Sequence, residues 1–547
     1  MELEIYFYRL EGEKQGRFSL AVEVDFWYWK KRGKTLAEVH WTRSIREAWS
    51  LARGRKEKSP EPVTMPVGHE LPAWMDQADR LFPVLAGRAL LWQEVQNLVE
   101  KHMSGMDLKT IKRALQILIL EQKCQLKPGV IKLGSVRRWR CERCRHQGEE
   151  IKATVCSSCG GECAVCEHCL LMGRSRACTP FFLFEPEANQ PAKPACKDPA
   201  FSLTLNQQRA SSRIETLLEN QEKKVLVWAV TGAGKTEIMF PVIQKWLDRG
   251  KRILWATPRK DVVLELYPRM REFFPATVAL YGGSPHRWLS SPLVLATCHQ
   301  MWRYHHAFDL MIIDEVDAFP LDGDPALESG LHRAMAPDGQ QVLLTATPPV
   351  YWQDSVKRGR LAAVMLPARY HGCPLPLPKL FLESRLWTKI SKGKPVAVLT
   401  RFLQQLDECR GQALIFVPRV RDVRLVLLWL KKNAPSCFAR AGGVHARDPF
   451  REQKIREFRE GKWIVLVTTT ILERGVTVPR CHVLVMGGDH PVFDEATLVQ
   501  IAGRVGRNAG YQKGVVWFLS EEKTMAQKQA LKKIKWLNHF AEKEGFC

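Results

Sequence analysis

The sequence predicts an α/β protein with two parallel-sheet lobes, preceded by a cysteine-rich module and an α+β region. From Phe201 onward, strand-like runs alternate with helix-like runs, which is typical of a parallel sheet covered on both faces. A glycine turn and Gly-Lys-Thr follow the apolar run Val225–Trp228, and two carboxylates follow the apolar run Leu310–Ile313. Eight of the sixteen cysteines lie between positions 141 and 178. These observations indicate a nucleotide site and a metal module.

The stretch Ala229–Thr236 has the pattern of a phosphate-binding loop between a buried strand and a helix start. Its glycines let backbone N–H groups curl around a polyphosphate, Lys235 can reach the β and γ phosphates, and the Thr236 hydroxyl can hold Mg²⁺. The usual motif has Gly where this chain has Ala229, so a turn that serves packing alone is the competing interpretation. The residues predicted to bind ATP are Gln207, Thr231, Gly232, Ala233, Gly234, Lys235, Thr236, Glu237 and Gly475.

Asp314 and Glu315 supply the acidic partner that such a loop requires. Four apolar residues form a buried strand ahead of them, and the two carboxylates emerge at its end. We therefore expect Asp314 to hold Mg²⁺ together with Thr236. Upstream of the loop, Gln207 has the amide group that can pair with two edges of adenine and so select ATP.

The composition indicates a polyanionic partner. Lys plus Arg outnumber Asp plus Glu by 82 to 58 in 547 residues, and the formal net charge of +24 favours nucleic acid or an anionic membrane face. The amino terminus has no signal-peptide pattern, and no apolar run approaches the roughly 18 residues that span a bilayer. We expect a cytosolic protein of roughly three or four domains, whose clustered cysteines bind metal and do not form disulfides.

The first 58 residues mix short apolar runs with the aromatic and basic stretch Phe26–Arg32. Single strands of nucleic acid stack on such aromatic faces. A contiguous aromatic run on a strand nevertheless points half of its rings into a core, and we therefore expect core packing here. Two proline-containing stretches, Lys56–His69 and residues 179–200, are expected to be linkers.

Residues 86–135 predict a winged-helix unit. Apolar positions recur at helical spacing in Leu90–Lys101 and in Leu108–Gln122, and Cys124–Leu133 is expected to be a β-hairpin that turns near Pro128. Basic residues near the start of the second helix suit DNA, although such units contact proteins as often. The sequence leaves both uses open.

The clustered cysteines have the spacing of zinc ligands. Two cysteines separated by two residues can face one tetrahedral ion at about 2.3 Å, so each pair is half of a site. Eight thiolates allow one or two zinc ions, and the spacing does not decide whether the pairs are used consecutively or interleaved. The candidate zinc ligands are Cys141, Cys144, Cys156, Cys159, Cys163, Cys166, Cys169 and Cys178. The arginines around the first pair, expected to contact phosphates or to form a solvated rim, are Arg137, Arg138, Arg140, Arg143 and Arg145.

Further motifs follow in an order that resembles superfamily 2 helicases. Those of the first lobe are Ala256–Arg259, Ala296–Gln300, Asp314–Asp317 and Thr345–Pro348. Those of the second lobe are Ala413–Pro418, Thr468–Pro479 and Gln500–Arg507. The resemblance implies two RecA-like lobes with ATP in the cleft between them.

The same resemblance implies chemical roles. Asp314 would hold Mg²⁺, Glu315 would position or deprotonate the attacking water, and Arg504 and Arg507 would stabilise charge on the γ phosphate. The residues that resemble the motif coupling the cleft to the nucleic acid are Thr345 and Thr347. The residues expected at the nucleic-acid backbone are Thr257, Arg259, Thr297 and Thr470.

A cysteine module directly ahead of the first lobe, together with Leu171–Arg174 and Thr470–Thr477, looks like the ComFA family of competence helicases. The resemblance covers about residues 136–520. It implies an ATP-dependent single-stranded DNA translocase, peripheral at the cytoplasmic face of the cell membrane, that draws transforming DNA through a ComEC channel. ComFC and DprA are the implied partners, and ATP, Mg²⁺ and one or two Zn²⁺ are the implied cofactors.

Three other functions are compatible with parts of the sequence. A PriA-like replication-restart helicase also combines zinc-binding cysteines with these motifs, but its cysteines are inserted after the first lobe, whereas here they precede it. A zinc-dependent nucleic-acid-binding scaffold with a nucleotide switch would not require the full hydrolytic set of residues. RNA also stays open as the polymer, because backbone-tracking motifs barely distinguish it from DNA.

Length alone allows three or four domains, whereas the motifs and composition divide the chain into five regions. The expected bounds are 1–58 for an N-terminal α/β region, 70–135 for a winged-helix-like domain, 136–180 for the zinc-binding module, 201–366 for the first RecA-like lobe and 379–547 for the second. The basic segment Lys523–Lys543 is expected to be helical and to pack on the second lobe.

Overall fold

The computed structural model of the chain divides into two compact units. The first contains Met1–Lys197, Trp246–Ile312 and Ala318–Gln341, and the second contains Asp198–Lys245, Ile313–Asp317 and Val342–Cys547. The structure describes residues 4–42, 44–52, 61–62, 71–134, 138–187, 202–287, 289–473, 478–508, 510–511 and 514–546. Gly475, Arg137 and most of the two expected linkers lie outside these ranges. None of the described helices combines the length and the apolar character that crossing a membrane requires.

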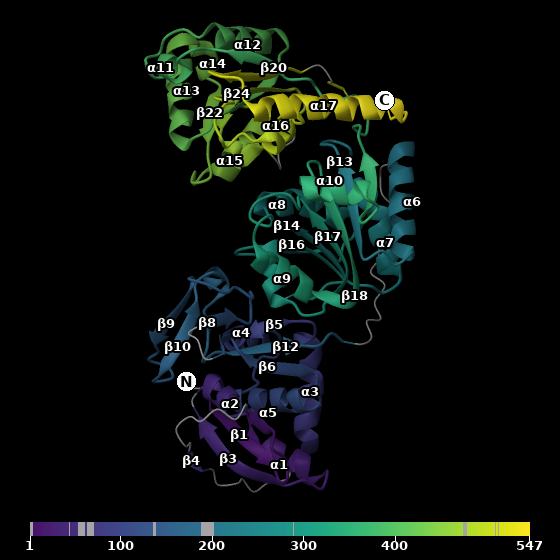
Figure 1. The fold of residues 1–547 in the computed structure, drawn as a ribbon, viewed down its shortest axis with the longest axis vertical. Coiled ribbons are helices and arrows are strands. Elements are labelled where there is room, and N and C mark those ends of the chain that lie inside the picture. The colour runs from purple at the N-terminus through teal and green to yellow at the C-terminus, as the bar shows by residue number, and fades with distance from the viewer. Residues whose placement is uncertain are drawn as a thin grey trace. The chain divides into compact units, whose positions relative to one another are not determined.

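An antiparallel sheet with strand order β2-β1-β3-β4 forms the N-terminal part of the first unit (Figure 1). Its elements are β1 (Ile5–Leu10), β2 (Gly16–Ser19), α1 (Val22–Lys30), β3 (Leu36–Thr42), α2 (Ile45–Ala52) and β4 (Glu61–Pro62). Most of the aromatic stretch that the sequence placed on a strand lies in α1, so the strand prediction was wrong.

A buried carboxylate lies on the inner face of this helix. Tyr8 and Gln116 donate hydrogen bonds to the carboxylate of Asp25 at 2.6 and 2.9 Å, and helix geometry aligns Asp25 with buried Tyr28. Trp27 packs against the same core, as expected for this stretch. Sequence spacing cannot reveal Asp25 as a buried group, because its partners come from distant segments.

The next part of the first unit contains the two helices that the sequence predicts. Its elements are α3 (Leu71–Leu85), β5 (Ala89–Leu91), α4 (Trp92–His102), α5 (Leu108–Leu120), β6 (Cys124–Pro128), β7 (Val130–Leu133), β8 (Arg138–Cys141) and β12 (Pro180–Phe184). The expected hairpin does not form: β6 pairs antiparallel with β12, whereas β7 pairs with β8. Phe182 and Phe184 in β12 are fully buried, so the start of the stretch predicted as a second linker is a core strand.

Cys163 and Cys166 lie on a small three-stranded sheet, and the other six clustered cysteines lie in the segments around it. Its order is β11-β10-β9. The elements are β9 (Ile151–Val155), β10 (Glu162–Cys166), the 3-10 helix η1 (Leu170–Met172) and β11 (Ser175–Arg176). β10 pairs antiparallel with both neighbours, which holds the turns that contain the cysteines close together.

A seven-stranded sheet has the order β15-β16-β14-β17-β18-β13-β19. Its strands are β13 (Lys224–Ala229), β14 (Ile253–Thr257), β15 (Val278–Leu280), β16 (Leu293–Thr297), β17 (Phe308–Asp314), β18 (Met335–Thr345) and β19 (Ala362–Leu366). The helices are α6 (Leu205–Glu219), η2 (Glu237–Met239), α7 (Phe240–Asp248), α8 (Lys260–Phe273), η3 (Cys298–Arg303), α9 (Pro325–Ala334) and α10 (Val350–Lys357). Parallel pairing of β13 with β19 and of β14 with β16 confirms the predicted α/β class.

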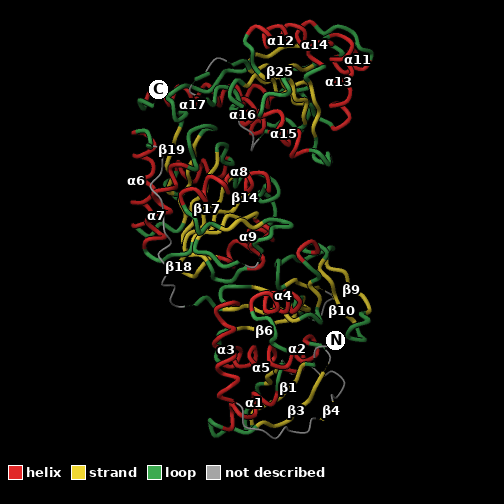
Figure 2. Tube along the Cα trace, turned by 180° about the vertical axis from the view of Figure 1, so that it is seen from behind, coloured by secondary structure: helices red, strands yellow, loops and turns green. Residues whose placement is uncertain are grey.

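A six-stranded parallel sheet with the order β20-β25-β24-β21-β23-β22 follows in the second unit. Its strands are β20 (Lys379–Leu382), β21 (Gln412–Phe416), β22 (Ala441–Val444), β23 (Val465–Thr468), β24 (Cys481–Met486) and β25 (Val516–Ser520). The helices are α11 (Leu386–Ser391), α12 (Ala397–Glu408), α13 (Val420–Asn433), α14 (Pro435–Phe438), α15 (Arg451–Arg459), η4 (Thr470–Leu472), α16 (Glu495–Ala502) and α17 (Met525–Lys543). Figure 2 shows α12 and α16 on opposite faces of this sheet.

The predicted C-terminal helix is confirmed as α17, which packs against α16. Ile534 and Leu537 are buried on its inner face. The outer part of the helix also reaches β13, because the Trp536 ring lies 5.5 Å from the ring of Trp228. Lys533 lies over the same Trp228 ring at 4.4 Å.

Ionisation of Asp25 should make the N-terminal region less stable as the pH rises. Burial raises the pKa of Asp25 to about 7. Because an unfolded aspartic acid ionises near pH ~3.9, the folded state binds one more proton between about pH 4 and pH 7, and the free energy of unfolding falls by about 1.4 kcal/mol per pH unit in this window.

The variant Asp25→Asn stays neutral and should lose this dependence. Urea unfolding followed by tryptophan fluorescence at several pH values between about 4 and 7 measures the difference. Parallel pH dependences for the variant and the original chain would show that Asp25 is already ionised in the fold.

Candidate nucleotide site and zinc module

The phosphate loop follows β13 and precedes η2, as the sequence predicts. Gly232 and Gly234 both have φ of 84°, a left-handed conformation that glycine adopts without strain. The Nζ of Lys235 donates to the carbonyl of Ala229 at 3.3 Å. Burial lowers the pKa of Lys235, whereas the carboxylates that follow β17 raise it. The ammonium group therefore lies beside the acidic pair, where phosphates and a cation would be held.

The acidic pair lies at the end of β17. Asp314 is 8% exposed, and its Oδ1 accepts a hydrogen bond from the backbone N–H of Glu315 at 2.9 Å. Glu315 has φ of 54°, which is uncommon for a residue other than glycine. Such conformations are concentrated at functional sites, where the surrounding fold holds them in place.

A chain of hydrogen bonds leads from the acidic motif to the second lobe. The hydroxyls of Thr345 and Thr347 donate to the two carboxylate oxygens of Asp317 at 2.7 and 2.6 Å. The side-chain amide of Gln500 in α16 donates to the Thr347 hydroxyl at 3.1 Å. Asp317 and Gln500 lie inside the helicase-like motifs, but the sequence alone does not predict this role for them.

The two candidate arginines of the second lobe lie just after α16. Arg507 packs over the phosphate loop, since a Cβ built on Gly232 would lie 3.7 Å from its Cγ. Arg504 is 2% exposed, and its Nε donates to the carbonyl of Glu473 at 2.9 Å. Arg507 therefore lies against the phosphate loop, whereas the buried Arg504 side chain is fixed by its contact with the Glu473 carbonyl.

A third arginine was missed by the sequence analysis. Arg369 donates from Nη1 to the carbonyl of Gly506 at 2.6 Å and from Nη2 to that of Val505 at 2.5 Å. Its Cγ would lie 3.6 Å from a Cβ on Gly232. Burial, with Arg507 nearby, lowers its pKa to about 10. Arg369 lies in a proline-containing connection that has no motif, so only the fold reveals it.

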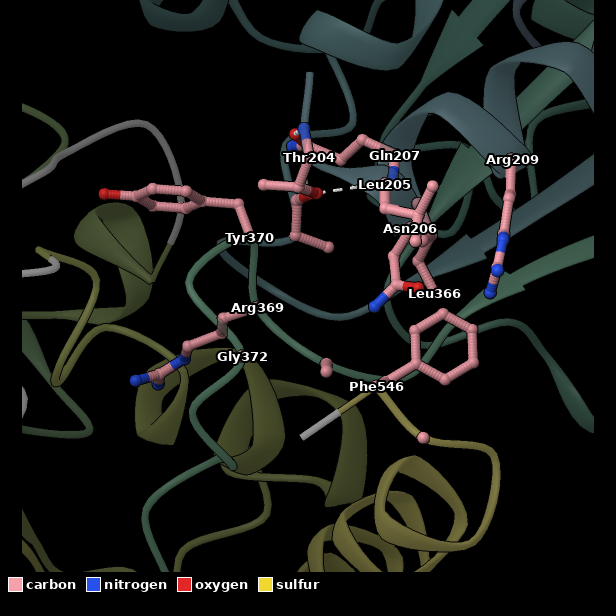
Figure 3. Close-up of a pocket in the computed structure, with 13 residues that line it drawn as sticks. Thr204, Leu205, Asn206, Gln207, Arg209, Leu366, Arg369, Tyr370, Gly372 and Phe546 are labelled. Atoms are coloured by element: carbon pink, nitrogen blue, oxygen red, sulfur yellow. Dashed lines mark hydrogen bonds between the residues drawn. The ribbon is translucent and has the colours of Figure 1, made fainter. Parts of the chain in front are cut away.

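A cavity of about 280 Å³ lies beside the loop (Figure 3). Gln207 lines it and is fixed by two contacts: its Oε1 accepts from the Thr204 backbone N–H at 3.0 Å, and its Nε2 donates to the Ala233 carbonyl at 3.0 Å. A Cβ on Gly234 would lie 2.2 Å from this Nε2, so a larger residue there would displace the Gln207 amide. Phe546, near the end of the described chain, lines the same cavity.

The candidate nucleic-acid residues of the first lobe lie at one edge of the sheet. Thr257 and Thr297 are register partners at the ends of β14 and β16. Both are buried, whereas Arg259, the residue before α8, is half-buried. Thr470 opens η4 in the second lobe. Their contact with nucleic acid stays a prediction.

The eight cysteines form two groups in which all the sulfur atoms lie within 4.8 Å of one another. The members are Cys141, Cys144, Cys166 and Cys169 in the first site, and Cys156, Cys159, Cys163 and Cys178 in the second. Sulfur separations such as 3.8 Å between Cys141 and Cys169 match those of a tetrahedral site with Zn–S bonds of about 2.3 Å. Both groups fit zinc, and the question left open by the spacing is answered: the sites are interleaved.

The arginines around the first pair have different environments. Arg140 and Arg145 form ion pairs with Glu142 at 2.8 and 2.9 Å. Arg143 is fully buried, so it neither belongs to a solvated rim nor is available to phosphates. Its Nη2 donates to the carbonyl of Cys169 at 3.2 Å.

Comparisons with known proteins agree with this architecture. The chain matches a DEAD/DEAH box helicase model at residues 204–355, a helicase conserved C-terminal domain model at 394–509 and a competence protein ComFA N-terminal domain model at 76–183. The first two confirm tandem RecA-like helicase domains.

Three relatives show how specific the likeness is. Competence protein ComFA of Bacillus subtilis (strain 168) is 38% identical over 413 residues, which are 74% of this chain and 87% of that protein. Competence protein ComFA of Streptococcus pneumoniae is 34% identical over 373 residues, 68% of this chain and 85% of that protein. Replication restart protein PriA of Rickettsia felis is 25% identical over 228 residues, 37% of this chain and 34% of that protein.

Interleaved and consecutive zinc sites predict different metal contents for one variant. Replacing the four cysteines of the first site by serine should leave one zinc ion per chain, because all four ligands of the second site remain. Consecutive pairing would leave no complete site in this variant. Elemental analysis of the purified protein distinguishes the two outcomes, and a zinc-free variant would contradict the interleaved arrangement.

Proposed function

Because the chain belongs to the ComFA family of competence proteins, we propose that it is an ATP-driven translocase that draws single-stranded transforming DNA into the cytoplasm. The observation that carries this proposal is the assembly in one unit of the phosphate loop, the acidic pair and Arg507. These are the groups that ATP hydrolysis requires. The net charge of +24 suits a polyanionic track.

The residues of the nucleotide site have complementary tasks. When bound, ATP supplies the phosphoanhydride bond that is cleaved, and Mg²⁺ neutralises negative charge on its phosphates. Lys235 binds the β and γ phosphates, and the oxygens of Thr236 and Asp314 are suitable Mg²⁺ ligands. Glu315 positions or deprotonates the attacking water. Arg507, with Arg504 behind it, stabilises negative charge that develops on the γ phosphate.

Gln207 and the cavity beside it are our proposed adenine site. The Gln207 amide is already oriented by Thr204 and Ala233, so little side-chain entropy remains to be lost when a base binds. An amide can pair with adenine through one donor and one acceptor. This arrangement supports selection of ATP over other nucleoside triphosphates.

The hydrogen-bonded chain through Asp317 is our proposed coupling element. Thr345 and Thr347 share this carboxylate, and Gln500 extends the chain to α16. A change in the second lobe that breaks the Gln500 contact would alter how Thr347 is held. We propose that Arg259, Thr297 and Thr470 contact the DNA backbone. Thr257 has no exposed surface, so it is not among these contacts.

Family membership also supports a place of action and partners. We propose that the protein works at the cytoplasmic face of the cell membrane, next to a ComEC-type channel, with ComFC and DprA as further partners. Anionic lipid and DNA would both attract a chain with this net charge.

The alternatives are less well supported. PriA of R. felis matches only 34% of its own length, and here the cysteines precede the first lobe. A nucleotide switch without hydrolysis would not require both the acidic pair and Arg507. RNA stays open as the polymer, and stimulation of ATP hydrolysis by RNA would favour it.

Removing single groups should separate hydrolysis from DNA binding. Lys235→Ala and Glu315→Gln should reduce ATP hydrolysis by about 10²- to 10⁴-fold, because each removes a group that acts on the reacting phosphate. The affinity for single-stranded DNA should change by less than about twofold. Glu328→Gln, at an exposed position on α9, is the matched control. Full hydrolysis by Glu315→Gln would contradict the assigned role.

Movement along DNA can be measured without a duplex. Oligonucleotides with biotin and streptavidin at either end report translocation, because a motor that reaches the end displaces the streptavidin. We expect ATP-dependent displacement from one end and none by Glu315→Gln. Rapid hydrolysis with no displacement from either end would refute a translocase.

A further inference from the structure

We propose that the first zinc site fixes the position of η3, the helix that directly follows Thr297, through a buried ion cluster centred on Glu94. The significance for DNA rests on the function proposed above, where Thr297 contacts the backbone. The positional part of the inference is independent of that function. We call Glu94, Arg143 and Arg303 the Glu94 cluster.

The Glu94 cluster joins three segments that are far apart in the sequence. Arg303 in η3 donates from Nε to Oε1 of Glu94 at 2.6 Å, and Nη1 of Arg143 lies 3.7 Å from Oε2. Their exposed fractions are 6% for Glu94, 0% for Arg143 and 3% for Arg303. Buried charges of this kind are tolerated only when they are paired, so each member requires the others in place.

The first zinc site holds the Arg143 end of the cluster. Arg143 lies between the ligands Cys141 and Cys144, and its Nη2 donates to the carbonyl of a third ligand, Cys169. A metal ion that binds all these thiolates therefore fixes both the backbone that carries Arg143 and the carbonyl that it contacts.

The same site also contacts η3 through Met172, three residues after Cys169. The Met172 carbonyl accepts from Nη2 of Arg303 at 3.4 Å, and its sulfur lies 3.5 Å from Nη1. Gln300 contacts the same sulfur at 3.8 Å and accepts from Nη1 of Arg303 at 2.7 Å. Two side chains of η3 are thus held by the residue that ends η1.

Arg333 in α9 provides a parallel connection. Its Nη1 donates to the carbonyls of Glu142 and Arg143, inside the Cys141–Cys144 turn, at 3.1 and 2.5 Å. Its Nη2 donates to the carbonyl of Trp302 in η3 at 2.7 Å. Backbone of the zinc turn and backbone of η3 are consequently tied to one guanidinium group.

These contacts make Glu94 and Arg303 positioning residues, which act on DNA through η3. Loss of the first zinc ion would release the Cys141–Cys144 turn and the Cys169 carbonyl. Arg303 would then lose its fixed partners, and η3 would no longer hold Thr297 at the end of β16. The second zinc site provides a control with the same chemistry.

Hydrogen exchange tests the positional part directly. In the full-length chain, Cys141→Ser with Cys144→Ser should remove one zinc ion and raise amide exchange in peptides covering 297–306. Cys156→Ser with Cys159→Ser should also remove one zinc ion but leave these peptides protected. Unchanged protection in the first variant, or equal loss in both, would overturn the proposal.

Glu94→Gln tests the cluster with both zinc sites intact. We expect two zinc ions per chain and a roughly tenfold higher concentration of single-stranded DNA for half-maximal binding, measured by fluorescence anisotropy, in line with energies measured between coupled residues. The KM for ATP should not change. Glu100→Gln, exposed on the same helix, is the control. Wild-type affinity and wild-type exchange in Glu94→Gln would refute the coupling.

The two parts can fail separately. If the first-site variant loosens η3 but no form of the protein binds single-stranded DNA, the positional coupling is retained and the proposed function is wrong. If the original chain binds DNA and neither the first-site variant nor Glu94→Gln weakens that binding, the function is retained and the coupling to DNA is wrong.

Discussion

The carboxyl ends of neighbouring parallel strands determine where the chemistry of this protein lies. β17, β18 and β13 are neighbours in the seven-stranded sheet, and they end at Asp314, Thr345 and Ala229. Parallel strands end at the same edge, so the acidic pair, the coupling threonines and the phosphate loop meet there. The position of half-buried Lys235 near the two carboxylates follows from this geometry.

Features with local signals could be predicted from the sequence. The glycines and the buried strand before them predict the phosphate loop. Alternating strand and helix patterns predict both lobes. Two-residue spacing predicted that the clustered cysteines are candidate zinc ligands, and the fold gathers all eight into two groups of four. The helices around residues 92–102 and 108–120 were predicted within a few residues of their bounds.

Features that depend on distant partners could not be predicted. The strand β6 pairs with β12, more than fifty residues later, so the hairpin predicted from the local pattern of residues 124–133 was wrong. The two-residue spacing does not show which cysteines share a group, and Cys163 joins Cys178, far along the chain, only in the folded protein. Arg143 looked like a surface cation because its counter-ion, Glu94, lies in the distant helix α4. The cysteine module therefore packs against the first lobe, where Arg143 and Arg303 of η3 both contact the buried carboxylate of Glu94.

The most direct test of the account is ATP hydrolysis by the purified chain with single-stranded DNA, duplex DNA or single-stranded RNA, each titrated at two salt concentrations. A translocase for transforming DNA should be stimulated most by single-stranded DNA, with half-saturation that shifts to higher DNA concentration as salt rises, since phosphate contacts release counterions. Equal or stronger stimulation by RNA, or none by any polymer, would contradict the account.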